Sequence, residues 1–390
     1  MIQSKDIYLI TSLSFLLSAC SPQLPTNISS ESAELTNHIH LHTTDDWGYQ
    51  CDFLGAMPDN PDNPKGIEGV VPSDLDTEKV IEVCHEAIKS YPNIDRYRFN
   101  LGRAYFYNDD GSKAYDLLAP LAKDDYVAAH ISLGNLYEFG AEGIEYSYDL
   151  ANKWYRRGAE LGYSVAQFNY ATSYYCGKGV DENDIEAIKW YNKAAKQGYV
   201  DAQYQLAEIY YYGHGVEVSY KLAAEWYLKA AAQGHVESQT QLGYMYRDGE
   251  GVEESYEQAL HWYQRAAKQE DDLAQFGIGY LYEKGLGVPQ SYKTAKKWYD
   301  LAADNGNYYA MNNLGFLYAN GYGVPQSYKM AMQWYLKSAE YGNETAMENV
   351  ALFYSNGNAG EVSEQKALDW RLKAAEAGHS VSEEEQQADK

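Results

Sequence analysis

The chain has 390 residues, of which 45% are hydrophobic, and its formal net charge is −25 at pH 7. This charge excludes a broad nucleic-acid interface, which needs Lys and Arg side chains to displace counterions from phosphates, and it disfavours an anionic lipid surface. The length exceeds that of one ordinary compact domain, so we expect either several domains or a repeat array. The 40 tyrosines suit a thin core, because tyrosine buries its ring and keeps its hydroxyl in water.

Residues 1–19 predict a signal peptide. A short apolar run ends at Leu17 and is too short to cross a bilayer as a helix. Two small residues then precede Cys20, which resembles the lipobox of bacterial lipoproteins, where the cysteine sulfur takes a diacylglycerol and the chain is cleaved before it. We therefore predict lipidation at Cys20 and a periplasm-facing place in the bacterial envelope, with membrane contact through the lipid anchor only. Ser21 resembles the context that directs lipoproteins to the outer membrane.

Residues 20–73 predict a flexible tether that follows the acylated cysteine. The segment is rich in Ser, Thr, Pro, Asn and Asp and has no helical apolar period. His38, His40 and His42 alternate and could bind a transition metal on an extended backbone, but alternating histidines in a linker are more often polar filler. We predict no metal site. The residues around Trp47 suggest a small ordered patch that docks on the folded body.

Residues 74–124 predict a cap helix followed by one helix pair. The cap helix is expected at Thr77–Ser90. The pair, between Asp95 and Asp124, has only a short loop at Asp109–Gly111.

Residues 125–378 carry a repeat of fixed length. The repeat is marked by tryptophans spaced 36 residues apart, namely Trp154, Trp190, Trp226, Trp262, Trp298, Trp334 and Trp370. Such a period means stacked supersecondary units, each of which cannot bury its apolar face alone.

One period predicts two antiparallel helices. Ala202, Leu206 and Tyr210 share one face of a first helix, which predicts its core side. The Gly213–Val216 segment ends this helix, because glycine accepts the left-handed conformation past a helix end. A second helix is expected from about Tyr220 to Gly234.

The Gly-x-Gly-Val motif recurs once per period at Gly177–Val180, Gly213–Val216, Gly249–Val252, Gly285–Val288 and Gly321–Val324. These motifs closely resemble the Sel1-like repeat, a relative of the tetratricopeptide repeat with a longer loop between its helices. The resemblance covers about residues 125–378 and implies an all-α fold, a right-handed superhelical α-solenoid of antiparallel helix pairs. The pair within 74–124 resembles a plain tetratricopeptide unit. Residues 379–390 predict a disordered acidic tail.

Three cysteines remain after lipidation of Cys20, and an oxidising periplasm would allow one disulfide with one thiol left over. We favour Cys51 with Cys84. Cys176 lies inside a regular repeat, where it can be buried as a small apolar residue.

The resemblance also implies a partner-binding groove. In tetratricopeptide-like solenoids the first helix of each unit lines the concave face, and its non-core side supplies the contacts. That phase gives an aromatic and acidic row: Phe168, Tyr175, Asp201, Tyr204, Glu208, Tyr211, Tyr244, Arg247, Phe276, Tyr280, Glu283 and Phe316. Tyrosine-rich patches with a few charges are typical of protein-binding hot spots, and the acidic members favour a basic protein partner. The alternative for about half of these rings is that they pack between repeats.

The sequence contains no pattern typical of catalysis. The glycine motifs end helices and do not follow strands, and neither a nucleophile elbow nor a zinc-binding His-Glu-x-x-His is present. We therefore predict no enzyme and no cofactor, and a scaffold lipoprotein that binds another protein in its groove.

Two alternatives to the scaffold remain open. The first is a periplasmic immunity protein that neutralises a secreted phospholipase-like effector of the type VI system. The second is a β-lactamase, as described for cysteine-rich Sel1 relatives, although this chain lacks their paired cysteines in each repeat. The identity of the partner and the oligomeric state are not determined by the sequence.

Overall fold

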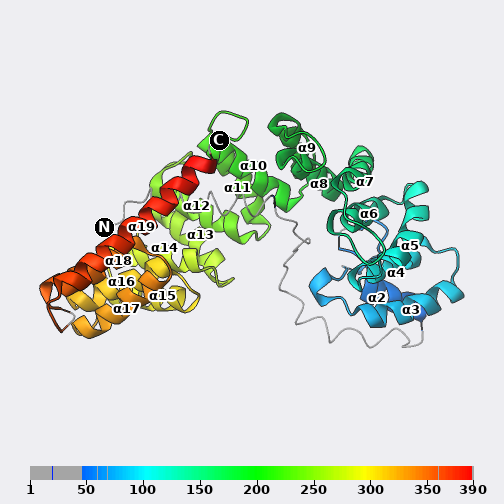
Figure 1. The fold of residues 1–390 in the computed structure, drawn as a ribbon. Helices are drawn as coiled ribbons and strands as arrows, with labels where there is room; N and C mark the ends of the chain where they lie inside the picture. The colour runs from blue at the N-terminus through cyan, green and yellow to red at the C-terminus, as the bar shows by residue number, and fades with distance from the viewer. Residues whose placement is uncertain (1–19, 21–45, 59, 68, 359, 389–390) are drawn as a thin grey trace. The chain divides into compact units, whose positions relative to one another are not determined.

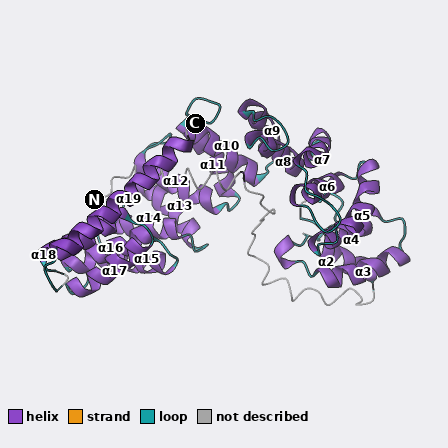
Figure 2. Ribbon diagram, in the orientation of Figure 1, coloured by secondary structure: helices purple, strands orange, loops and turns teal. Residues whose placement is uncertain are grey.

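The structure is a computed structural model that describes residues 20, 46–58, 60–67, 69–358 and 360–388 (Figure 1). The described residues form helices and loops without a strand, apart from one isolated bridge between Ala141 and Ile144 (Figure 2). The chain divides into an N-terminal unit, residues 17–202, and a C-terminal unit from residue 203 onward. The predicted signal peptide, Ser21 and the alternating histidines lie outside the described residues.

The N-terminal unit contains a short leading helix and then successive antiparallel helices. They are α2 (Trp47–Gly55), α3 (Thr77–Ser90), α4 (Asp95–Tyr107), α5 (Gly111–Lys123), α6 (Val127–Phe139), α7 (Tyr148–Glu160), α8 (Ser164–Tyr175) and α9 (Asp184–Lys196). The cap helix and the short-loop helix pair predicted from the sequence correspond to α3, α4 and α5.

The C-terminal unit continues the same alternation of helices, and the division between the units falls near the start of α10. Its helices are α10 (Val200–Tyr212), α11 (Tyr220–Ala232), α12 (Val236–Asp248), α13 (Tyr256–Ala267), α14 (Asp272–Lys284), α15 (Tyr292–Asp304), α16 (Tyr308–Asn320), α17 (Tyr328–Glu340), α18 (Glu344–Asn356) and α19 (Glu364–Ala388). Each repeat supplies two helices. The first, such as α12, also contacts the first helix of the next repeat and is called the inner helix below, and the second, such as α13, is called the outer helix.

Recurring caps set where the helices begin and end. The side chain of Ser255 accepts a hydrogen bond from the Gln258 amide at the start of α13, and serines at the equivalent positions cap α11, α15 and α17. These bonds satisfy amides that have no partner within the helix. The inner helix α12 ends at Gly249 in the left-handed conformation, with φ of 70°. The repeat motif thus marks a helix end, as the sequence predicts.

Each outer helix packs closely on its inner helix because small residues face a tyrosine ring. A Cβ atom at Gly243 would lie 2.3 Å from the ring of Tyr263, and one at Gly279 would lie 2.6 Å from Tyr299. Tyr263 and Tyr299 are the residues that directly follow the periodic tryptophans, and both are fully buried. The repeating core is therefore formed by these tyrosines more than by the tryptophans.

The periodic tryptophans lie mostly half-buried on the outer helices. Above several of these indole rings lies a basic side chain from the next turn of the same helix. The Lys193 ammonium lies 3.3 Å from the ring centroid of Trp190, and the Lys229 ammonium lies 3.6 Å from the ring centroid of Trp226. A cation over an indole face is attracted by the ring quadrupole while it stays hydrated. The tryptophans thus pack partly into the core and remain partly exposed to solvent.

Two predictions about the ends are wrong. The described part of the expected tether, residues 46–58, 60–67 and 69–73, packs on the first helices, so the flexible tether is wrong for these residues. The small ordered patch expected around Trp47 is confirmed as α2, which contacts α3 and α4. The expected disordered tail belongs to α19, which continues to Ala388. Glu and Gln are good helix formers, and the segment after Gly378 has no proline or turn motif to stop the helix.

Candidate protein-binding surface

The predicted groove residues lie on the inner helices, but most are buried. In the C-terminal unit Tyr244 is only 2% exposed and Tyr211 7% exposed. The remaining buried members of the predicted row are Tyr175, Glu208, Arg247, Phe276 and Glu283. Four are half-buried, namely Phe168, Asp201, Tyr204 and Tyr280. Phe316 is exposed, at 38%.

Tyrosines from the outer helices explain this burial. Their hydroxyls extend between the helices and bond the inner-helix side chains: Tyr227 donates to Glu208, and Tyr299 donates to Glu283 Oε2 over 2.7 Å. The Tyr244 ring packs edge-on against Tyr263, with centroids 5.4 Å apart. The expectation that Tyr211 and Tyr244 are free groove contacts is therefore wrong, because helical phase alone does not show how far the next helix reaches.

Burial also changes the charge of the row. Removal from water raises the pKa of Glu208 to about 8, against the lowering effect of the Tyr227 hydroxyl, and the carboxylate of Glu237 adds to the rise. Burial likewise raises the pKa of Asp271 to about 6, although the Ala274 amide and the Thr240 hydroxyl both bond this carboxylate. Glu208 is therefore mostly protonated and neutral at pH 7, and it cannot attract a basic partner as the sequence suggests.

Two other charged members of the row, Arg247 and Glu283, are paired locally. Arg247 lies 2.6 Å from the Asp248 carboxylate, and its guanidinium carbon is 4.9 Å from the centroid of the Tyr244 ring. Glu283 contacts the ammonium of Lys284 at 2.5 Å. The inner face of the C-terminal unit is thus dominated by aromatic rings and neutralised ions.

An apolar stripe remains accessible on this unit. It consists of Tyr280, Phe316 and Leu352, which come from α14, α16 and α18 at one repeat phase. Tyr280 is half-buried, Phe316 is 38% exposed and Leu352 is 50% exposed. Beside it Tyr322 packs against Phe316, with centroids 5.7 Å apart. Leu352 was missed from the sequence, although extending the 36-residue period by one unit would have found it.

The N-terminal unit differs, because the chain's own N-terminal loop, described at residues 56–58, 60–67 and 69–72, lies against its inner helices. The buried guanidinium of Arg103 on α4 donates to the main-chain carbonyls of Gly55, Ala56 and Val70, the second over 2.9 Å. The Val70 amide donates to the Ala56 carbonyl over 2.8 Å and closes the loop. Asn60 donates to the Tyr126 hydroxyl over 3.1 Å. The first inner helices therefore already hold a peptide segment.

The structure joins the cysteines in two pairs. Cys51 of α2 is bonded to Cys84 of α3, the pair favoured from the sequence. Cys20 is bonded to Cys176, so the expectation that Cys176 stays unpaired is wrong. A sulfur in a disulfide cannot also carry a diacylglycerol thioether, so this bond and the predicted lipidation of Cys20 exclude each other. The sequence did not indicate this pair, because the two cysteines are 156 residues apart and only the folded chain brings Cys20 to Cys176 at the end of α8.

Other classes of site are not found in the described part of the chain. Its His, Cys, Asp and Glu side chains include no group of three or more that could hold a metal ion. Among the described helices, none is both long and apolar enough to cross a membrane.

The geometry defines the class of protein: an α-solenoid of antiparallel helix pairs with a fixed period. The Sel1 repeat model matches seven consecutive segments, at residues 127–163, 164–199, 200–235, 236–271, 272–307, 309–343 and 345–379. The chain belongs to the Sel1 repeat family, whose scaffold generally mediates protein–protein contacts.

Two solved structures are similar over most of the chain. A protective antigen present in uropathogenic Escherichia coli strains is 34% identical, with a TM-score of 0.68, over 76% of this chain and 64% of that one. The chain thus spans slightly less than two thirds of that protein. A Sel1 repeat protein from Oxalobacter formigenes is 30% identical, with a TM-score of 0.60, over 79% of this chain and 90% of that one. No curated protein sequence matches the chain.

Proposed function

We propose that the chain is a non-enzymatic scaffold of the bacterial cell envelope that binds a protein partner along the apolar stripe of its C-terminal unit. The observation that carries this proposal is the alignment of Tyr280, Phe316 and Leu352 on three successive inner helices. Accessible apolar side chains in a row supply the buried centre of an interface, where most of the binding energy is concentrated. The net charge of −25 favours a partner with a basic rim around its own apolar contact.

Photo-crosslinking in living cells tests the stripe. A benzoylphenylalanine at position 316 should form a covalent adduct with a partner protein. The matched control is position 301, because Leu301 is 49% exposed but lies on the outer helix α15. The Phe316→Ala and Leu352→Ala double variant should lose binding and keep its helical circular dichroism. Adducts of equal yield at both positions, or adducts at 301 alone, would contradict the proposal.

The envelope location rests on the lipobox-like segment that ends at Cys20. Intact-mass spectrometry of the protein from cell membranes should show a thioether-linked diacylglycerol and an acylated amino terminus on Cys20. A reducible bond between Cys20 and Cys176 and no lipid mass would instead support the pairing in the structure and end the anchor proposal. The Cys20→Ala variant should leave the membrane fraction if the anchor is the only membrane contact.

A further inference from the structure

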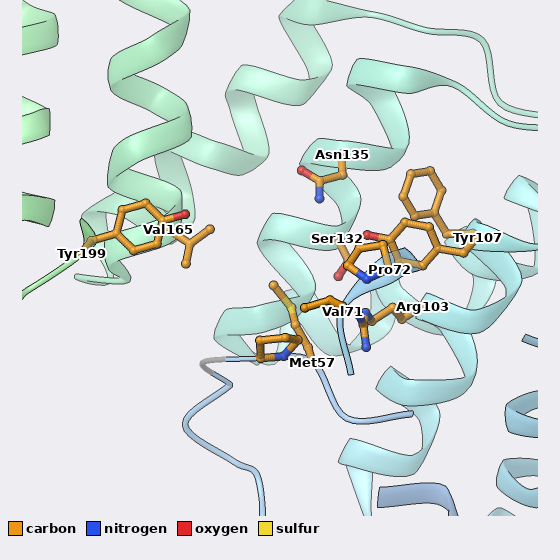
Figure 3. Close-up of a pocket in the computed structure, with 11 residues that line it drawn as sticks. Met57, Val71, Pro72, Arg103, Tyr107, Ser132, Asn135, Val165 and Tyr199 are labelled. Carbon is orange, nitrogen blue, oxygen red and sulfur yellow. The ribbon is translucent and has the colours of Figure 1, made fainter. Parts of the chain in front are cut away.

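A pocket of about 40 Å³ lies between the N-terminal loop and the inner helices α4, α6 and α8 (Figure 3). Its wall is mostly apolar, with Met57 and Pro72 from the loop, Tyr107 from α4 and Val165 from α8. One water needs roughly 10–15 Å³ of such space, so the pocket has room for one small side chain.

Two buried polar side chains of α6 also line this pocket. Asn135 is 5% exposed and accepts a 2.8 Å hydrogen bond at Oδ1 from the Tyr155 hydroxyl, while its Nδ2 donates to no acceptor among the described residues. Ser132 is equally buried and its hydroxyl has no hydrogen-bond partner in the described part of the chain. An acceptor placed in the pocket would therefore give Asn135 Nδ2 a hydrogen-bond partner that the described part of the chain does not supply.

The charges around the pocket indicate a neutral ligand. The cation that lines it, Arg103, is already bonded to three main-chain carbonyls of the chain itself. The same contacts show that this face of the N-terminal unit already holds polypeptide, the end of α2 and the N-terminal loop, through main-chain carbonyls. A segment that continues this interface would place a carbonyl near Asn135 and a small side chain between Met57 and Val165.

We propose that the pocket binds an extended segment of a partner protein, with a valine or proline side chain in the apolar cavity and a main-chain carbonyl accepting from Asn135 Nδ2. The proposal rests on the proposed protein-binding function and adds a second contact, in the N-terminal unit, that selects for side-chain size. It also gives the N-terminal loop a role, since the loop forms one wall of the pocket.

The test is a selection of phage-displayed random peptides on the mature full-length chain, followed by affinity measurements with the selected peptides. Ser132→Leu fills the existing cavity and so should keep the fold, as circular dichroism would verify. It should weaken binding about tenfold or more, because the peptide loses about 1.4 kcal/mol of side-chain burial. Asn135→Ala should weaken binding about tenfold through the lost hydrogen bond. Leu150→Ala, an exposed position on the outer helix α7, is the control and should change nothing.

Selected peptides that share a valine or proline and lose affinity in both pocket variants would support the inference. Enriched peptides that bind the wild type and Ser132→Leu equally would overturn it, as would a selection that enriches no peptide. Peptides that keep their affinity for both pocket variants but lose it with Phe316→Ala and Leu352→Ala would overturn the pocket alone and leave the stripe as the binding surface.

Discussion

Replacing Glu208 by Gln should remove a pH dependence that this buried carboxyl imposes on the stability of the C-terminal unit. Its pKa rises from 4.5 in water to about 8 in the fold, so the folded chain holds a proton here that the unfolded chain releases. The stabilisation from this proton is full below pH 4.5 and is lost as the pH rises through 8. At 1.36 kcal/mol for each pKa unit, the loss across this window is about 5 kcal/mol.

The Glu208→Gln variant separates the effect of the Glu208 carboxyl on stability from the effects of other titrating groups. Glutamine has the shape of the protonated acid and keeps an oxygen that accepts from the Tyr227 hydroxyl. Asp271, whose raised pKa acts in the same direction, is present in both proteins and cancels in the comparison. Urea unfolding followed by far-ultraviolet circular dichroism, in steps from pH 5 to pH 8, should show the wild type losing stability relative to Glu208→Gln. If the difference in unfolding free energy between the two proteins stays constant over this range, Glu208 does not have a raised pKa.

Three further variants test the core and the N-terminal unit. Tyr244→Ala should lower the free energy of unfolding by about 3–5 kcal/mol, because it leaves a cavity beside Tyr263, and the midpoint of chemical unfolding measures this loss. Gly243→Ala should cost about 1–3 kcal/mol in the same assay through the clash of its new Cβ with the Tyr263 ring, and an unchanged midpoint would show that the helices separate easily. Cys51→Ala combined with Cys84→Ala should cost about 2–4 kcal/mol, and adding reductant to the Cys20→Ala variant, which keeps only the Cys51–Cys84 bond, should lower its stability by a similar amount.

Two of the wrong predictions failed because contacts with other segments bury or order the residues concerned. Helical phase places Tyr211 and Tyr244 away from the core side of their own helices, but Tyr227 and Tyr263 of the neighbouring outer helices cover them. The composition of the N-terminal loop is typical of a linker, yet Arg103 holds it through three carbonyls that any sequence would offer. Because such contacts use main-chain atoms, the amino-acid composition of the loop does not show that the loop is ordered.

The repeat could be predicted from the sequence alone. A 36-residue period of tryptophans, with glycines after each inner helix and serines before most outer helices, specifies helix pairs locally, because caps and apolar periodicity act within a few residues. Which inner-helix side chains stay accessible depends on the packing of neighbouring helices against one another, which helical phase does not reveal. The same holds for Phe316 and Leu352 in their stripe and for Asn135, whose Nδ2 becomes a candidate contact because the N-terminal loop forms a pocket with α6.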